Sequence, residues 1–116
     1  MIRTIPQLTV IDIEQETASV SSYKNIPLSI FNDHVVRVGV MTEPFYWHYH
    51  PNSDETFMGI EGTLLIDLED RTVELKPGQL FTIPAMVKHC TRPLGGRSVN
   101  LTFELAEMET VSCDAS

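Results

Sequence analysis

The stretch WHYHPNSDE, residues 47 to 55, places two of the chain's four histidines one residue apart and an acidic pair after a short turn. In an extended strand, residues two apart point to the same face, so His48 and His50 project together. A turn over residues 51 to 54 lets Glu55, which opens the next run, return toward both imidazoles. Imidazole nitrogens with a carboxylate suit divalent transition metals such as Fe, Mn, Co, Ni, Cu or Zn better than Ca or Mg. The stretch therefore predicts three convergent metal ligands.

Short β-type runs separated by turn residues fill the chain from residue 35 onward. These runs are VVRVGVM, FYWHYH, TFMGI, TLLIDL, TVELK, QLFTIP, HCTRP and SVNLTFEL. Proline and glycine recur between them at short, regular intervals. In the last run Val99, Leu101 and Phe103 alternate with polar residues, which predicts a strand with one buried face. Many short strands at this spacing predict an all-β jelly-roll sandwich or barrel.

Composition limits the classes of partner. A chain of 116 residues, 42% of them hydrophobic, suits a single domain, 1–116. Its net charge of −8 provides no attractive field for nucleic acid or an anionic membrane, so neither partner is expected. No stretch approaches the roughly 18 apolar residues that span a bilayer, and the N-terminus lacks a secretory pattern, which predicts a cytoplasmic protein. Residues 1–30 are expected to form an edge strand or extension, and the polar residues 107–116 a flexible tail.

Two segments resemble the motifs of the cupin family. The segment from His48 to Gly62 is similar to the first motif, His-x-His-x4-Glu-x6-Gly, at every spacing, and the segment from Gly78 to His89 to the second, Gly-x5-Pro-x-Gly-x2-His. The short separation between them is like that of small prokaryotic single-domain cupins of the mannose-6-phosphate-isomerase-like group. This resemblance covers about residues 35–105. It implies a cupin-type jelly-roll β-barrel, frequent homodimers, and one divalent transition metal held by His48, His50, Glu55 and His89.

The sequence departs from the second motif at two positions. Met86 stands where the motif has glycine, and methionine does not adopt positive φ at low energy. Either the turn differs or Met86 shapes the mouth of the cavity. Phe57 shares the face of Glu55 by parity, so Phe57 and Met86 are the predicted substrate-pocket residues. Pro93 replaces an asparagine, which predicts that its strand ends early or lies at an edge.

The sequence leaves two classes of function open for a small-molecule substrate or ligand. One is a metal-dependent enzyme, either a dioxygenase acting on a small enol, diketone or aromatic compound, or an isomerase working through an enediol. The other is a non-catalytic module that binds metal or a small ligand. A phosphosugar isomerase needs arginine or lysine aimed into the cavity. None of the eight basic residues falls on the ligand face where parity can be read, and this favours the dioxygenase.

Two further expectations concern residues outside the ligand set. Trp47 and Tyr49 alternate with the ligands on the opposite strand face, which favours a subunit interface and a homodimer. His34 lies outside both motifs and is not expected to bind metal.

Overall fold

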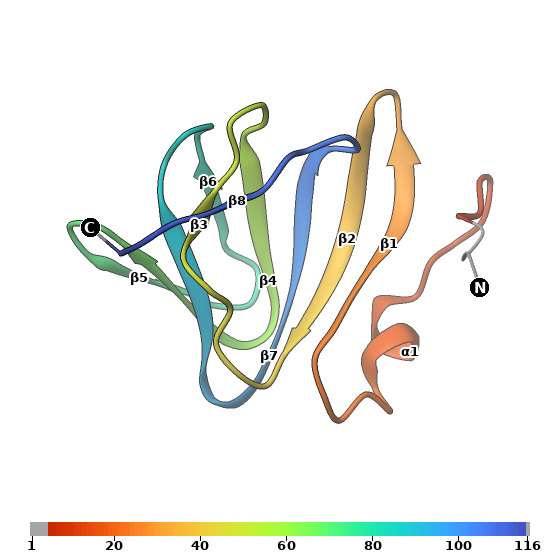
Figure 1. Ribbon diagram of the computed structural model, residues 1–116. Coiled ribbons are helices and arrows are strands. Elements are labelled where there is room, and N and C mark those ends of the chain that lie inside the picture. Colours follow the sequence, from red (N-terminus) through yellow and green to blue (C-terminus); the bar gives the residue numbers. More distant parts are fainter. Residues whose placement is uncertain (1–4, 116) are drawn as a thin grey trace.

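The computed structural model describes residues 5–115 and is built almost entirely from antiparallel strands (Figure 1). The all-β prediction is confirmed. The elements are α1 (Ile13–Thr17), β1 (Lys24–Phe31), β2 (His34–Met41), β3 (His48–Tyr49), β4 (Glu55–Leu68), β5 (Thr72–Leu75), β6 (Leu80–Ile83), β7 (His89–Leu105) and β8 (Val111–Ser112). No helix among these residues has the length and apolar character needed to cross a membrane.

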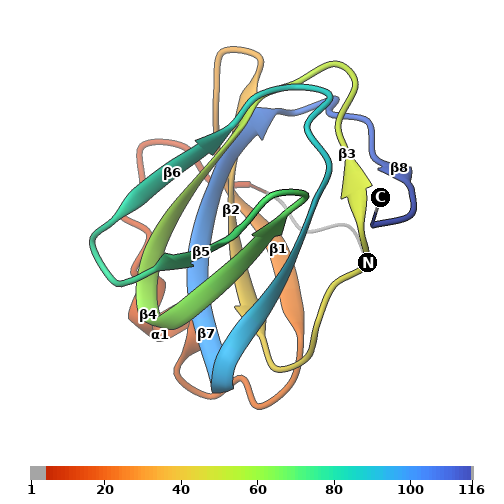
Figure 2. The ribbon, with the colours of Figure 1, turned by 90° about the vertical axis from the view of Figure 1, so that its left-hand side faces the viewer.

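The two long strands, β4 and β7, hold the sheet together. β4 pairs with β5, β6 and β7, and β7 pairs with β2, β3 and β4, while β1 lies at the edge beside β2. Their pairing is interrupted by register shifts around Glu61, and such bulges bend and twist a strand. The sheet therefore curls around an interior. The short strands β3 and β8 lie on the other side of this interior from β1 and β2 (Figures 1 and 2).

Both faces of β7 are buried between Ser98 and Thr102, which corrects the prediction of one buried face for the last long strand. The outer face of β7 carries Val99 and Leu101, which pack in a core with apolar residues of β1 and β2. Ile11 and Ile13, at and before the start of α1, cover this core from outside. The polar residues that alternate with them on β7 are buried on the inner face. They are Ser98, Asn100, Thr102 and Glu104.

The inner face has an apolar core of its own toward the β4, β5 and β6 end. Its buried members are Met41, Phe57, Leu64, Ile66, Leu75 and Ile83. Burial of such side chains is the main favourable contribution to folding. Because this core fills only part of the interior, the polar residues of β7 face a different part of it.

The turn after β6 takes the conformation that the motif glycine would provide. Met86 has a φ of +74°, and its N–H donates a 2.9 Å hydrogen bond to the carbonyl of His50. The residue is 61% exposed. Pro93 lies where β7 pairs with β4 on one side only, opposite Leu64, so the strand continues through it at an edge.

Residues 107–113 pack against the barrel, although a flexible tail was expected from their polar sequence. β8 pairs with β3, and the N–H of Cys113 donates to the carbonyl of Trp47. The side chain of Asn52 bonds to the backbone of Glu107 and Glu109. We call residues 107–113 the C-terminal strap. Most of the hydrogen bonds that anchor the strap use its main-chain atoms. The side-chain sequence of the strap therefore does not predict them. Residues 1–4 of the predicted extension lie outside the described residues.

Candidate metal centre

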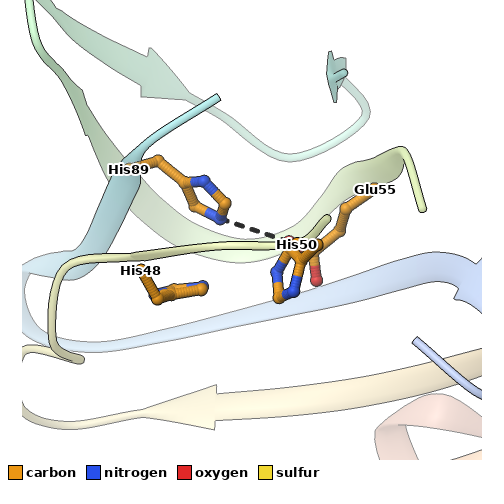
Figure 3. Close-up of side chains that lie close together, drawn as sticks. All are labelled: His48, His50, Glu55 and His89. Atoms are coloured by element: carbon orange, nitrogen blue, oxygen red, sulfur yellow. Dashed lines mark ion pairs between the residues drawn. The ribbon is translucent and has the colours of Figure 1, made fainter. Parts of the chain in front are cut away.

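Four side chains from three strands and one loop meet inside the barrel. His48 lies on β3, directly opposite His89 at the start of β7. His50 follows β3, and Glu55 opens β4 after the short turn. All four are buried, and one ligand atom from each lies within 4.8 Å of the others (Figure 3). The structure therefore brings together all four predicted ligands, while His34 lies outside the cluster.

All three imidazoles are held by their Nδ1 atoms. Each Nδ1 bonds to a backbone carbonyl: Tyr46 at 2.7 Å for His48, Glu109 at 2.9 Å for His50, and Val87 at 2.9 Å for His89. A carbonyl oxygen only accepts hydrogen bonds, so each Nδ1 carries a hydrogen, and in the neutral ring Nε2 keeps its lone pair for a metal. Such bonds orient histidine ligands in metal sites.

Three of the ligand atoms lack the partners that burial requires. Nε2 of His50, Oε1 of Glu55 and Nε2 of His89 are buried without a hydrogen-bond partner among the described residues. Oε1 of Glu55 lies 3.2 Å from Nε2 of His50 and 3.4 Å from Nε2 of His89. Unpaired buried polar atoms destabilise a fold, and a cation among them would satisfy all three. Three imidazoles and one carboxylate fit a divalent transition metal.

Burial and mutual contacts shift the pKa values of three members of the cluster. Burial lowers the pKa of His48 to about 4, so this imidazole is neutral. Burial alone would raise the pKa of the Glu55 carboxyl, but its close contacts with the imidazoles of His50 and His89 lower it to about 2. The same interaction with Glu55 outweighs burial and raises the pKa of His50.

A cavity of about 290 Å³ opens beside the cluster. Tyr23 and Phe45 line one part of it. Their rings are stacked, with centroids 6.2 Å apart. Phe57 lines it as predicted. Met86 is not among the lining residues, because its positive φ turns the backbone toward His50 while its side chain points to solvent.

The cavity also has a polar wall that sequence reasoning missed. Its members come from β1, β2 and β7 and are Asn25, Arg37, Asn100, Thr102 and Glu104. Nε of Arg37 lies 3.1 Å from Oε2 of Glu104. The expectation that no basic residue faces the ligand side is therefore wrong. Alternation in β2 carried the signal, because Val36 and Val38 on the outer face place Arg37 on the inner one.

Replacing Glu104 by glutamine should change how the free energy of unfolding of the metal-free protein depends on pH. Burial and the neighbouring Glu55 carboxylate raise the pKa of Glu104 from 4.5 to about 7. Because the folded-state pKa is the higher one, the stability from this proton is complete below about pH 4.5 and is lost as the pH rises through about 7. Relative to wild type, the variant should therefore gain about 2 to 3 kcal/mol between pH 4 and pH 8. Urea unfolding after chelator treatment measures this gain, and a pH-independent difference would contradict the burial of an ionisable Glu104.

Removing residues 107–116 should lower metal affinity by about 10- to 100-fold, the usual effect of losing an outer hydrogen bond to a ligand. The strap provides the Glu109 carbonyl for Nδ1 of His50, and the Thr110 hydroxyl lies 3.2 Å from the same nitrogen. Competition with a coloured chelator measures the affinity. Removing only residues 114–116 is the control and should leave it unchanged. Equal affinities of the two truncated proteins would show that the strap does not position His50.

The fold and the site define a class: small antiparallel β-barrel proteins with an interior three-histidine, one-glutamate cluster suited to a metal. The chain belongs to the cupin family, since the family model described as the Cupin domain matches residues 34–103. Among solved structures, a cupin-2 domain protein of Shewanella frigidimarina has a TM-score of 0.76 at 25% identity, covering 83% of this chain and 94% of that one. A Klebsiella pneumoniae protein with a double-stranded β-helix domain has a TM-score of 0.77 at 15% identity, covering 93% and 99%. The cupin-type barrel is thus confirmed, while the mannose-6-phosphate-isomerase-like group stays a prediction.

Two relatives are similar in sequence. "Uncharacterized protein YdbB" of Bacillus subtilis is 44% identical over 90 residues, which cover 77% of this chain and 79% of that protein. "Polyketide synthase CurC" of Streptomyces cyaneus is 34% identical over 61 residues, which cover 53% of this chain. The match spans only 40% of the Streptomyces protein.

Proposed function

We propose that this cupin is a metal-dependent enzyme acting on a small molecule with an enolisable carbonyl group. The observation that carries the proposal is the cluster of buried, unpartnered ligand atoms beside a cavity of about 290 Å³. A divalent transition ion bound there would polarise a substrate oxygen as a Lewis acid. The barrel walls would exclude bulk water, and Phe57 and Phe45 would contact the apolar part of the substrate.

Between the two enzyme types, the polar wall favours isomerase-type over dioxygenase-type chemistry. The preference for a dioxygenase rested on the expected lack of basic residues in the cavity, and Arg37 removes that reason. Glu104, with a pKa raised by burial to about 7, is suited to hold or release a proton near neutral pH. The partial match to a protein named polyketide synthase supports the substrate class, because polyketides carry enolisable carbonyls.

The test is hydrogen exchange at the carbon next to a carbonyl. Protein loaded in turn with Fe, Mn, Co, Ni, Cu or Zn is mixed with small diketones and hydroxyketones in deuterated water. NMR follows deuterium uptake and isomer formation while an electrode follows oxygen. We expect exchange with loaded protein and none with metal-free protein. Oxygen consumption would instead support the dioxygenase, and tight metal binding with no reaction would support the non-catalytic module.

The assembly we propose is a homodimer in the cytoplasm. We propose no nucleic-acid or membrane partner, because the chain carries a net charge of −8. Trp47 and Tyr49 are only half-buried in the single chain and suit a subunit contact. Light scattering should give twice the 13.1 kDa chain mass. A 13.1 kDa particle over a wide concentration range would remove the dimer.

A further inference from the structure

Arg37 is a charged residue on the inner face of the barrel, where apolar or neutral residues are expected. It lies in the middle of β2, opposite Thr102 of β7, and its side chain lines the cavity and is 34% exposed. Its neighbours Val36 and Val38 pack in the outer core. An arginine on the inner face of a barrel loses part of its hydration, so it needs a reason to be there.

Glu104 holds this arginine without using up its hydrogen bonds. Oε2 of Glu104 lies 3.1 Å from Nε of Arg37, and the Glu104 side chain is 1% exposed. No residue among 5–115 bonds to the two Nη atoms of Arg37, and Oε1 of Glu104 is buried without a hydrogen-bond partner. A positioned guanidinium with free Nη donors fits a carboxylate in a two-point contact.

The charges around the cavity point to the same kind of ligand. A divalent ion beside one ionised Glu55 carries a single net positive charge, and the Arg37–Glu104 ion pair adds none when both are ionised. A substrate with one negative charge would therefore neutralise the site, although the chain as a whole is acidic. A neutral diketone would leave both the positive charge and the Nη donors unmatched.

We propose that Arg37 is the anion-recognition residue of this site and that the substrate is a small oxo acid. Its carboxylate contacts the Nη atoms, while its carbonyl oxygen faces the cluster of His48, His50, Glu55 and His89. This inference rests on the proposed function and narrows its substrate class. Glu104 is the positioning residue, because its Oε2 lies beside Nε of Arg37 and leaves both Nη atoms available.

Calorimetry on zinc-loaded protein tests this inference with levulinate, an oxo acid, and levulinamide, its neutral analogue. Arg37→Gln should weaken levulinate binding about tenfold or more, the effect of losing a charge-assisted contact, and leave levulinamide binding unchanged. The matched control is Arg92→Gln, which breaks an arginine–carboxylate pair with Asp67 away from the cavity. It should leave both affinities as in wild type.

The role of Arg37 and the metal-dependent function would fail in different measurements. If Arg37→Gln does not fold because Glu104 is left unpaired, the double variant R37Q/E104Q removes that charge and should show the same loss. Equal levulinate affinity of zinc-loaded wild type and either Arg37 variant would overturn the role of Arg37 alone. A wild-type protein that holds none of Fe, Mn, Co, Ni, Cu or Zn would overturn the metal-dependent function and this inference with it.

Discussion

Replacing His50 by alanine should lower the affinity for a divalent transition metal by more than about 100-fold. Loss of an outer hydrogen bond to a ligand already weakens such sites by about 10- to 100-fold, and His50 is a direct ligand candidate. Its Nε2 is buried, faces Oε1 of Glu55 at 3.2 Å and has no hydrogen-bond partner among the described residues. Elemental analysis after dialysis and a competing chelator measure the change.

His34→Ala is the matched control, because this histidine lies outside the cluster. Its side chain is 42% exposed, its Nδ1 lies 2.8 Å from Asp33, and its ring stacks on Phe31. It should bind metal as wild type does. Wild-type metal content and affinity in His50→Ala would refute the four-ligand site, and loss in both variants would indicate unfolding rather than ligation.

Replacing Gly59 by alanine should destabilise the protein by about 3 kcal/mol, at the upper end for overpacking. A Cβ at this position would lie 2.3 Å from the carbonyl oxygen of Lys76 and 2.7 Å from its carbon. The backbone cannot easily move away. The N–H of Gly59 donates to the carbonyl of Gln79 at 3.0 Å, and the carbonyl of Gly59 accepts from Gly78 at 2.9 Å. Urea unfolding of the metal-free protein measures the loss.

Gly96→Ala provides the matched control on the other long strand. A Cβ there would meet no atom within 4 Å, and Gly96 is not among the glycines with positive φ. Its effect should stay within about 0.5 kcal/mol. Equal effects of the two substitutions would mean that β4 and the loop after β5 do not approach as closely as the structure shows.

The ligand cluster was predictable because its geometry is mostly local. Alternation in a strand puts His48 and His50 on one face, and one short turn returns Glu55 to them. Only His89 comes from a distant segment, and the resemblance to the cupin motifs supplied it. Phe57 followed from parity with Glu55, and it does line the cavity.

Met86 shows where the motif misled. The motif identified a position that requires positive φ, and the structure keeps that conformation with a methionine. A backbone angle does not say where the side chain points, however. The hydrogen bond from the Met86 N–H to His50 holds the turn, and the side chain is left in solvent.

By itself, the sequence determined the all-β class, the strands and the four candidate ligands, because alternation, turns and motif spacing are properties of short segments. Tertiary structure decided what surrounds that site. The N-terminal segment covers the outer face of β7, so the polar face turns inward, with Glu104 beside Arg37 in the cavity. The C-terminal strap orients His50 through a main-chain carbonyl. Alternation within β2 could place Arg37 on the inner face, but no local pattern encodes which segments the curled sheet brings into contact.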